Sequence, residues 1–175
     1  MFSTSNIISP DECIRMLGEQ TELSSLHVSP GVFTDVDFSD KVCIGCNFSH
    51  AKFLNCNFQY IKLRMCFLEF AEFENCNFQH SNIQFCSFGG ACFTDTCFKN
   101  SDILHTSFHG IKTDNVSFND SDLYNSNISH ATMSFTFFEN CNLKKLTLYK
   151  NTHNTVSFKS SNIRDALFLD SCKVF

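Results

Sequence analysis

Apolar residues recur at every fifth position over most of this chain, a period that neither an α-helix nor a conventional β-strand produces. The register that begins at Phe33 runs through 28 successive units, and only Thr113 and His153 are polar in it. A second register, two residues earlier in each unit, holds mostly small residues such as Ala51 and Cys76. Both registers must point inward from short extended pieces joined by corners, so we predict that the chain coils.

The length of one coil follows from a second period, because the sequence resembles itself more closely at a spacing of twenty residues than at five. Segment 51–59 aligns with 71–79 and then with 91–99. At this spacing seven residues form an unbroken Phe column: Phe38, Phe58, Phe78, Phe98, Phe118, Phe138 and Phe158. Four units therefore make one coil, and we expect seven coils between Gly31 and Asp170.

These repeats strongly resemble the pentapeptide-repeat family, whose pattern is Ala-(Asp/Asn)-Leu-x-x, over about 140 of the 175 residues. The resemblance implies an all-β fold, a right-handed four-sided β-helix. We therefore divide the chain into an N-terminal segment with a capping helix (1–30), the β-helix (31–170) and a C-terminal tail (171–175).

A solenoid needs covered ends, because its exposed strand edges and core otherwise associate. The segment Ser9-Pro10-Asp11-Glu12 has the form of a capping box. It predicts a short helix to about Leu17, with Gly18 as its stop, that lids the N-terminal end. For the C-terminal end we expect either a cover formed only by Val174 and Phe175 or a self-association surface that gives a homodimer.

Composition and charge bound the class of protein. The chain has 22 Phe, 11 Cys and a formal net charge of −5, and it has neither a long apolar run nor the pattern of a signal peptide. An odd number of cysteines in a chain of this size favours reduced thiols, so we expect a cytoplasmic protein, or an effector secreted without a cleavable signal. Neither direct nucleic-acid binding nor membrane association is indicated.

Two cysteine patterns require interpretation. Cys43 and Cys46 match a C-x-x-C motif, but both occupy inward registers, which favours small core residues over a redox or metal site. Cys92 and Cys97 lie between the inward registers, and we expect them to be partly exposed and the better candidates for reactive thiols.

Histidines occupy several outward positions, namely His50, His80, His105, His109 and His130. No carboxylate or thiol set completes a metal site with them. Inward His153, with Asn151, indicates either a hydrogen-bonded core pair or a functional depression. We find no catalytic set, no phosphate-binding loop and no cofactor motif, so we predict that the protein is not an enzyme.

The strongest candidate for function is a set of apolar residues at positions that should face outward. The set comprises Leu54, Tyr60, Met65, Phe67, Phe70 and Phe85, and a weaker set comprises Leu104, Tyr124, Phe135 and Phe137. Clustered outward aromatic residues mark contact sites, although these rings have the alternative of packing against corners or the N-terminal segment.

Two functions fit these observations. The first is a non-enzymatic protein-binding scaffold, such as a bacterial effector or adaptor, that docks another protein on this set of residues. The second is implied by the family resemblance, since some members mimic DNA, bind DNA gyrase and give resistance to quinolones or toxins. DNA carries about one negative charge per 1.7 Å, on the order of 20 over a rod of roughly 34 Å, far more than this chain offers.

Overall fold

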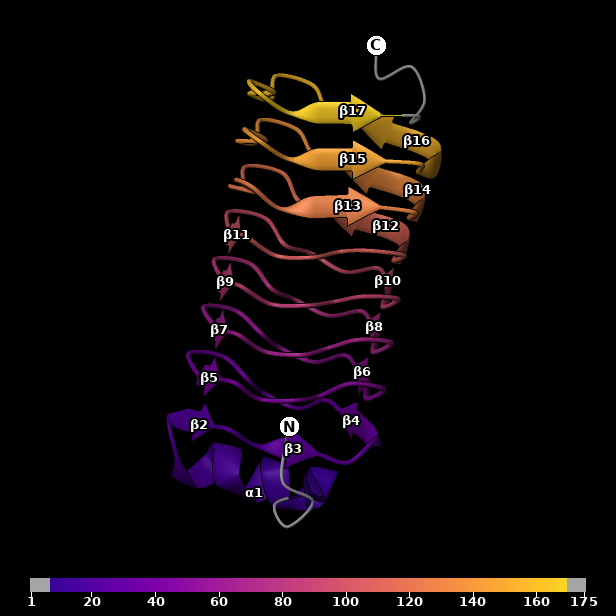
Figure 1. Ribbon diagram of the computed structural model, residues 1–175. Coiled ribbons are helices and arrows are strands. Elements are labelled where there is room, and N and C mark those ends of the chain that lie inside the picture. The colour runs from indigo at the N-terminus through magenta and orange to yellow at the C-terminus, as the bar shows by residue number, and fades with distance from the viewer. Residues whose placement is uncertain (1–6, 170–175) are drawn as a thin grey trace.

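The computed structural model describes residues 7–169, which form one helix and a rod of stacked coils (Figure 1). The chain begins with β1 (Ile7–Ile8) and α1 (Pro10–Glu19), and α1 lies beneath the first coil. Strands pair in parallel with partners twenty residues away, as Phe33 does with Phe53. The twenty-residue coil and the right-handed four-sided β-helix are confirmed.

Each coil has four sides, which we name in chain order the β4 side, the back side, the β5 side and the front side. The β4 side carries β4 (Val32–Thr34), β6 (Lys52–Leu54), β8 (Glu72–Glu74), β10 (Cys92–Thr94), β12 (Lys112–Ser117), β14 (Thr132–Phe137) and β16 (Thr152–Ser157). The back side, which begins at 36–39, is joined mainly by isolated bridges such as Asn57 to Asn77.

The other two sides contain the remaining strands. The β5 side carries β2 (Glu22–Ser24), β5 (Val42–Ile44), β7 (Lys62–Arg64), β9 (Asn82–Gln84) and β11 (Asp102–Leu104). The front side, which faces the viewer in Figure 1, carries β3 (His27–Val28), β13 (Asn127–Ser129), β15 (Thr147–Tyr149) and β17 (Leu167–Leu169). Between β3 and β13 this side is joined by bridges at Asn47, Phe67, Ser87 and Ser107.

The solenoid has about eight turns, one more than the seven predicted. The extra pairing lies at the N-terminal end, where β2 joins β5 and β1 joins β3. Leu23 and Val28 extend the five-residue apolar register backwards from Phe33, and both are buried. The stacked layers therefore include residues ahead of Gly31.

Helix α1 begins as the sequence predicts but ends later. Ser9 is its N-cap, with the Ser9 Oγ accepting a hydrogen bond from the Glu12 N–H at 3.1 Å. The predicted stop at Gly18 is wrong, because the helix continues to Glu19 and the Gln20 N–H still donates to the Met16 carbonyl at 2.8 Å. A stop at Gly18 would require a left-handed glycine, and Gly18 does not have positive φ.

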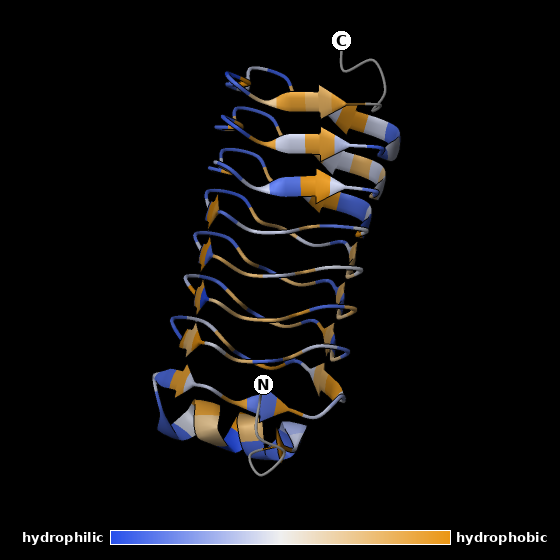
Figure 2. Cartoon of the chain, in the orientation of Figure 1, coloured by the Kyte–Doolittle hydropathy of each residue, from blue (hydrophilic) through white to orange (hydrophobic). Residues whose placement is uncertain are grey.

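The core consists of Phe columns that run along the rod. In the column that contains Phe78, ring centroids of neighbouring coils lie 4.3 to 5.2 Å apart and the rings are nearly parallel. A second column contains Phe53 and Phe73, and the two columns meet edge to face, with Phe53 and Phe58 centroids 5.3 Å apart. In Figure 2 the hydrophobic residues recur in the strands of both lateral columns, with hydrophilic residues at many of the bends.

The small inward residues do more than leave space for the rings, because many also donate a hydrogen bond to the coil below. The Ser101 Oγ donates to the Phe78 carbonyl at 2.8 Å, and the Ser126 Oγ donates to the Ile103 carbonyl at 2.9 Å. The Cys66 Sγ likewise donates to the Cys43 carbonyl at 3.3 Å. Ser, Thr and Cys in this register therefore satisfy backbone carbonyls that would otherwise lack this partner.

The conformations of the sides change near residue 111. Before this point a hydrogen-bonded turn ends the front side, as in the 3.0 Å bond from the Ala91 N–H to the Phe88 carbonyl. After it the turn ends the β5 side, as in the 3.2 Å bond from the Ser126 N–H to the Leu123 carbonyl. Strands consequently leave the β5 side after β11 and appear on the front side from β13 (Figure 1).

The ring columns predict how the cost of truncating a Phe depends on its layer. Phe78→Ala removes a fully buried ring with neighbours above and below, so we expect a loss of about 3–5 kcal/mol in the free energy of unfolding. Phe158→Ala, in the last coil where the ring is only half-buried, should cost less than half as much. Urea denaturation followed by circular dichroism measures both, and equal losses would contradict the stacking account.

Candidate functional site

The corners of the coil impose a backbone conformation that bulky side chains disfavour. From Ser25 to Asp165 nearly every fifth residue has positive φ, a region that Gly, Asn and Asp enter most easily. Half of these corner residues are Gly, Asn or Asp, whereas five are large apolar residues with φ of 46° to 58°: Tyr60, Met65, Phe70, Phe85 and Phe135. Each of these residues is exposed, so burial in the core does not explain its presence.

The corner rings are held by histidines of neighbouring coils. The Phe70 ring stacks on His50 at 5.2 Å between centroids, and Phe85 stacks on His105 at 4.9 Å. The other face of Phe70 packs against Gly90, where an added Cβ would lie 2.6 Å from the ring. Phe70 therefore presents its ring edge to solvent, and stacking fixes the orientation of both rings.

The structure brings four of the six predicted contact residues to one face. Met65 and Phe85 lie on the corner where the chain enters the front side, Phe67 lies on that side, and Phe70 lies on the corner where the chain leaves it. Their exposed fractions are 55%, 57%, 38% and 60%. We call Met65, Phe67, Phe70 and Phe85 the front patch.

The other two predicted residues lie elsewhere. Tyr60 is at the corner between the back side and the β5 side, where it stacks on His80 at 5.0 Å. Leu54 is half-buried at the end of β6 on the β4 side. In the weaker set Tyr124 contacts His105, and Phe135 occupies a corner that the front patch does not share.

Sequence reasoning missed some exposed apolar side chains, including Val32, Leu167 and Leu169. Leu167 and Leu169 lie on β17 in the same outward positions of the front side as Phe67 and Glu69, a hundred residues later. Their place in the twenty-residue period was the available signal, but the predicted set consists mainly of aromatic residues.

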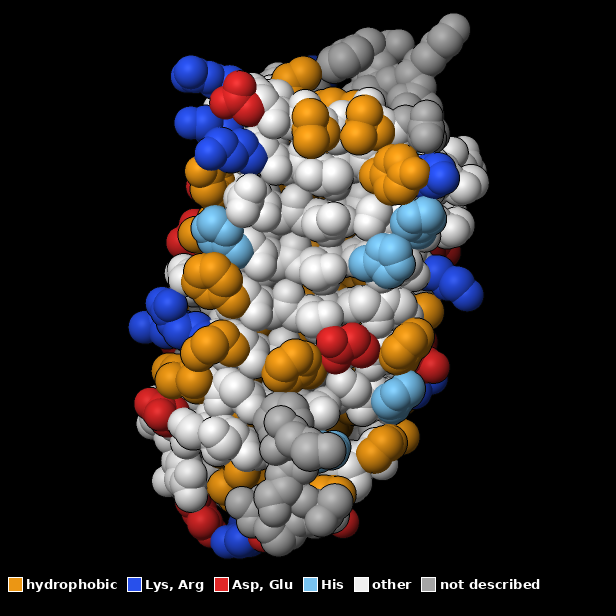
Figure 3. Space-filling view, in the orientation of Figure 1, with side chains coloured by type: hydrophobic (Ala, Val, Ile, Leu, Met, Phe, Trp, Pro, Cys, Tyr) orange, Lys and Arg blue, Asp and Glu red, His pale blue; other side chains and the backbone are white. Residues whose placement is uncertain are grey.

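The front side carries almost no charge. Among its outward positions from Asn47 to Leu169, only Glu69 is an Asp, Glu, Lys or Arg, and its carboxylate accepts a hydrogen bond from the Ser49 Oγ at 2.9 Å. Figure 3 shows hydrophobic side chains in the lower half of this face, with uncharged polar groups across its middle. The front patch is thus an apolar region beside a neutral surface.

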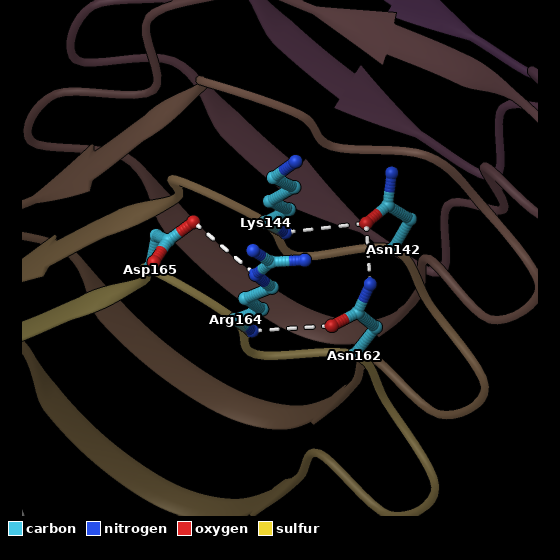
Figure 4. A network of polar contacts seen from close by, with 5 residues as sticks. All are labelled: Asn142, Lys144, Asn162, Arg164 and Asp165. Atoms are coloured by element: carbon cyan, nitrogen blue, oxygen red, sulfur yellow. Dashed lines mark hydrogen bonds and ion pairs between the residues drawn. The ribbon is translucent and has the colours of Figure 1, made fainter.

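Charged groups gather instead on the β5 side towards the C-terminal end (Figure 4). Asn162 Nδ2 donates to Asn142 Oδ1 at 3.3 Å, and both Asn side chains accept from backbone N–H groups two residues later, those of Lys144 and Arg164. Arg164 pairs with Asp165 at 3.7 Å. The hydrogen bonds of Asn142 and Asn162 hold the backbone of both coils in place. The Lys144 ammonium points away from the two Asn side chains (Figure 4).

The inward cysteines are buried and free, as predicted for Cys43 and Cys46. Burial raises the pKa of Cys13 to about 12 and that of Cys141 to about 11. The neighbouring sulfur of Cys46, together with burial, raises the pKa of Cys66 well above its usual range. All ten cysteines among residues 7–169 are free.

Asn151 and His153, the inward polar pair near the C-terminal end, do not form the hydrogen-bonded pair that was one of the two expectations. Asn151 bonds to backbone, accepting from the Ala131 N–H at 2.8 Å and donating to the Ile128 carbonyl at 2.9 Å. The His153 Nε2 is buried without a hydrogen-bond partner. A mutual Asn151–His153 hydrogen bond was therefore a wrong expectation, because the backbone of the coil below takes both ends of the Asn amide.

Other chemical features of residues 7–169 are few. The described part of the chain holds no group of three His, Cys, Asp or Glu side chains placed to bind a metal ion. No helix in that range has the length and apolar character to cross a membrane. The expected cover of the C-terminal end by Val174 and Phe175, and the tail from 171 to 175, lie outside the described residues.

Comparison with protein families identifies pentapeptide repeats, in eight copies, at residues 32–69, 68–100 and 114–144. These segments cover more than half of the sequence, and the chain belongs to the pentapeptide-repeat family. No curated protein matches it.

Among solved structures the chain is similar to trypsin-treated QnrB1, a plasmid-mediated fluoroquinolone resistance protein, at 15% identity and a TM-score of 0.44, covering 81% of this chain and 83% of that one. It is also similar to a pentapeptide repeat protein from the Arabidopsis thaliana thylakoid lumen, at 23% identity and a TM-score of 0.42, covering 54% and 63%. A third is Rfr23 from the cyanobacterium Cyanothece 51142, at 11% identity and a TM-score of 0.38, covering 90% and 98%.

Thiol accessibility gives a direct test of the assignment of the cysteines. Cys92 and Cys97 are partly exposed, whereas Cys13, Cys66 and Cys141 are buried and protonated at neutral pH. We expect iodoacetamide at pH 8 to label Cys92 and Cys97 in the native protein and the buried three only after unfolding. Peptide mapping by mass spectrometry measures this, and native labelling of Cys66 at the rate of Cys97 would contradict the packed core.

Proposed function

We propose that the protein is a non-enzymatic, effector-type scaffold that binds another protein through the front patch. The observation that carries the proposal is that Met65, Phe70 and Phe85 are exposed at corners with positive φ. Non-Gly residues in this conformation cost on the order of 1 kcal/mol each, and Asn would cost less. Three exposed residues that carry this stability cost and gather around one face support a role in recognition.

The surroundings of the patch favour a protein partner. Phe70 and Phe85 supply apolar area with ring orientations fixed by stacking, so little side-chain entropy is lost on binding. The neutral middle of the front side also limits the desolvation penalty that charged groups would impose. A partner that extended around the neighbouring corners would also contact Leu54 and Tyr60.

The proposal includes self-association at the C-terminal end. Leu167 and Leu169 are about half exposed on the last strand, and a cavity of about 420 Å³ is lined by residues that include Phe158 and Ile163. Homodimerisation through this end would cover that apolar surface. The proposal also keeps the cytoplasmic location that the cysteine content favours.

The alternative function, a DNA mimic that binds DNA gyrase and gives quinolone or toxin resistance, has weaker physical support. A DNA mimic requires dense negative charge along its length, whereas this chain has a net charge of −5. Its front side is almost uncharged, and Lys144 and Arg164 lie on the neighbouring side. Affinity capture with identification of the bound protein distinguishes the two functions.

The patch hypothesis predicts that stability and partner capture respond in different directions. Phe70→Asn with Phe85→Asn should leave the melting temperature unchanged or slightly higher, because Asn tolerates the corner conformation, and should lower partner recovery by about tenfold or more. Affinity capture from the source lysate, quantified by mass spectrometry, measures recovery.

Phe135→Asn is the matched control, because Phe135 has the same residue type, similar exposure and a positive φ but lies at another corner. It should retain capture. Undiminished recovery by the double variant, or an equal loss in the control, would refute the front patch as the binding surface. Recovery of gyrase subunits would support the alternative function.

A further inference from the structure

A groove lies between α1 and the first coils, away from the front patch. It has a volume of about 620 Å³ and is bordered by the helix on one side and by residues of the β4 and back sides on the other. Ile14 of α1 and Val36 of the back side are partly exposed and give the groove apolar walls. Two carboxylates, Asp35 and Asp37, face the same space.

The one lysine of the groove is already engaged. Helix α1 has no basic residue in its last turn, and the Lys41 ammonium takes that place by donating to the Leu17 carbonyl at 2.6 Å and the Gln20 carbonyl at 3.0 Å. These bonds direct the positive charge at the negative end of the helix dipole. Lys41 therefore stabilises the N-terminal lid, and its charge also helps to keep Asp37 ionised.

Both carboxylates of the groove accept hydrogen bonds from neighbouring groups. Asp35 accepts a hydrogen bond from Asn55 Nδ2 at 3.1 Å, and Asp37 accepts from the Ser39 N–H at 2.9 Å. The hydrogen bonds from Ser39 lower the pKa of Asp37, so it is ionised at neutral pH. Within residues 7–169 neither carboxylate forms an ion pair.

Gly18 keeps the helix side of the groove open. It lies inside α1 without positive φ, and a Cβ built on it would meet nothing within 4 Å. Gly destabilises a helix relative to Ala, and neither backbone geometry nor packing requires Gly here. The residue leaves room for a chain that lies against the helix.

We propose that this groove binds an arginine side chain of a protein partner, with flanking apolar residues against Ile14 and Val36. A guanidinium matches two carboxylates, because its planar fork donates several hydrogen bonds and its charge is weakly hydrated. The alkyl stem of the arginine covers the apolar walls. This site is separate from the front patch and does not depend on it.

The test is a titration of the ¹⁵N-labelled protein with the peptide acetyl-Leu-Arg-Leu-amide, followed by NMR amide shifts. The matched probe replaces Arg with citrulline, which has nearly the same shape and no charge. We expect saturable shifts at Gly18, Asp37 and Ser39 with the arginine peptide, and affinity at least tenfold weaker with citrulline.

Variants locate the binding. Asp35→Asn with Asp37→Asn should weaken the arginine peptide about tenfold or more, and Gly18→Leu should abolish the shifts while raising the melting temperature. Asp120→Asn is the control, since Asp120 is a corner carboxylate with the same kind of Asn partner on another part of the rod. Equal binding of the citrulline peptide, shifts confined to other residues, or full affinity in the Asp35/Asp37 variant would overturn the proposal.

Discussion

Stacking of equivalent side chains between successive coils is the interaction on which the rest of this structure depends. A parallel coil spacing near 4.8 Å is also a favourable separation for offset aromatic rings, so one Phe repeated every twenty residues satisfies backbone and side chain together. Phe58 and Phe78, with centroids 4.3 Å apart, show how closely the two spacings agree. Because large rings fill every layer, the other inward position must be small, and Ser101 and Cys66 use that position to hydrogen bond to the coil below.

A core of this kind leaves the corners and outward positions free to vary, but the corner conformation still restricts them. Asn55 and Asn75 show the compliant solution, with side chains that hydrogen bond along the corner at 2.9 Å. Phe70 and Phe85 depart from it, and His50 and His105 support them by stacking. The departures from the corner rule are therefore more informative about recognition than exposure alone.

The sequence predicts the core almost completely, because period, column and coil length follow from Phe38 and its successors at fixed spacing. The sequence is less informative about features that depend on contacts between distant segments. Gly18 looks like a helix stop, yet it does not adopt the positive φ of a glycine stop, and Lys41 binds the Leu17 and Gln20 carbonyls where the helix ends. Outward positions were identified without being sorted by side, although the twenty-residue period allows it, so Tyr60 was grouped with Phe67 although they lie on different sides. The groove beside α1 arises from packing of the lid, which no periodic pattern encodes.

The most direct measurement of the central claim is thermal unfolding, followed by circular dichroism, of two deletion variants. Removal of 71–90 takes out one whole coil and leaves every remaining column in register, so a cooperative transition at a moderately lower temperature is predicted. Removal of 71–88 is nearly the same length but shifts small and polar residues into the large inward positions, so it should lose the cooperative transition. Equal behaviour of the two variants would contradict the claim that the twenty-residue register holds the fold together.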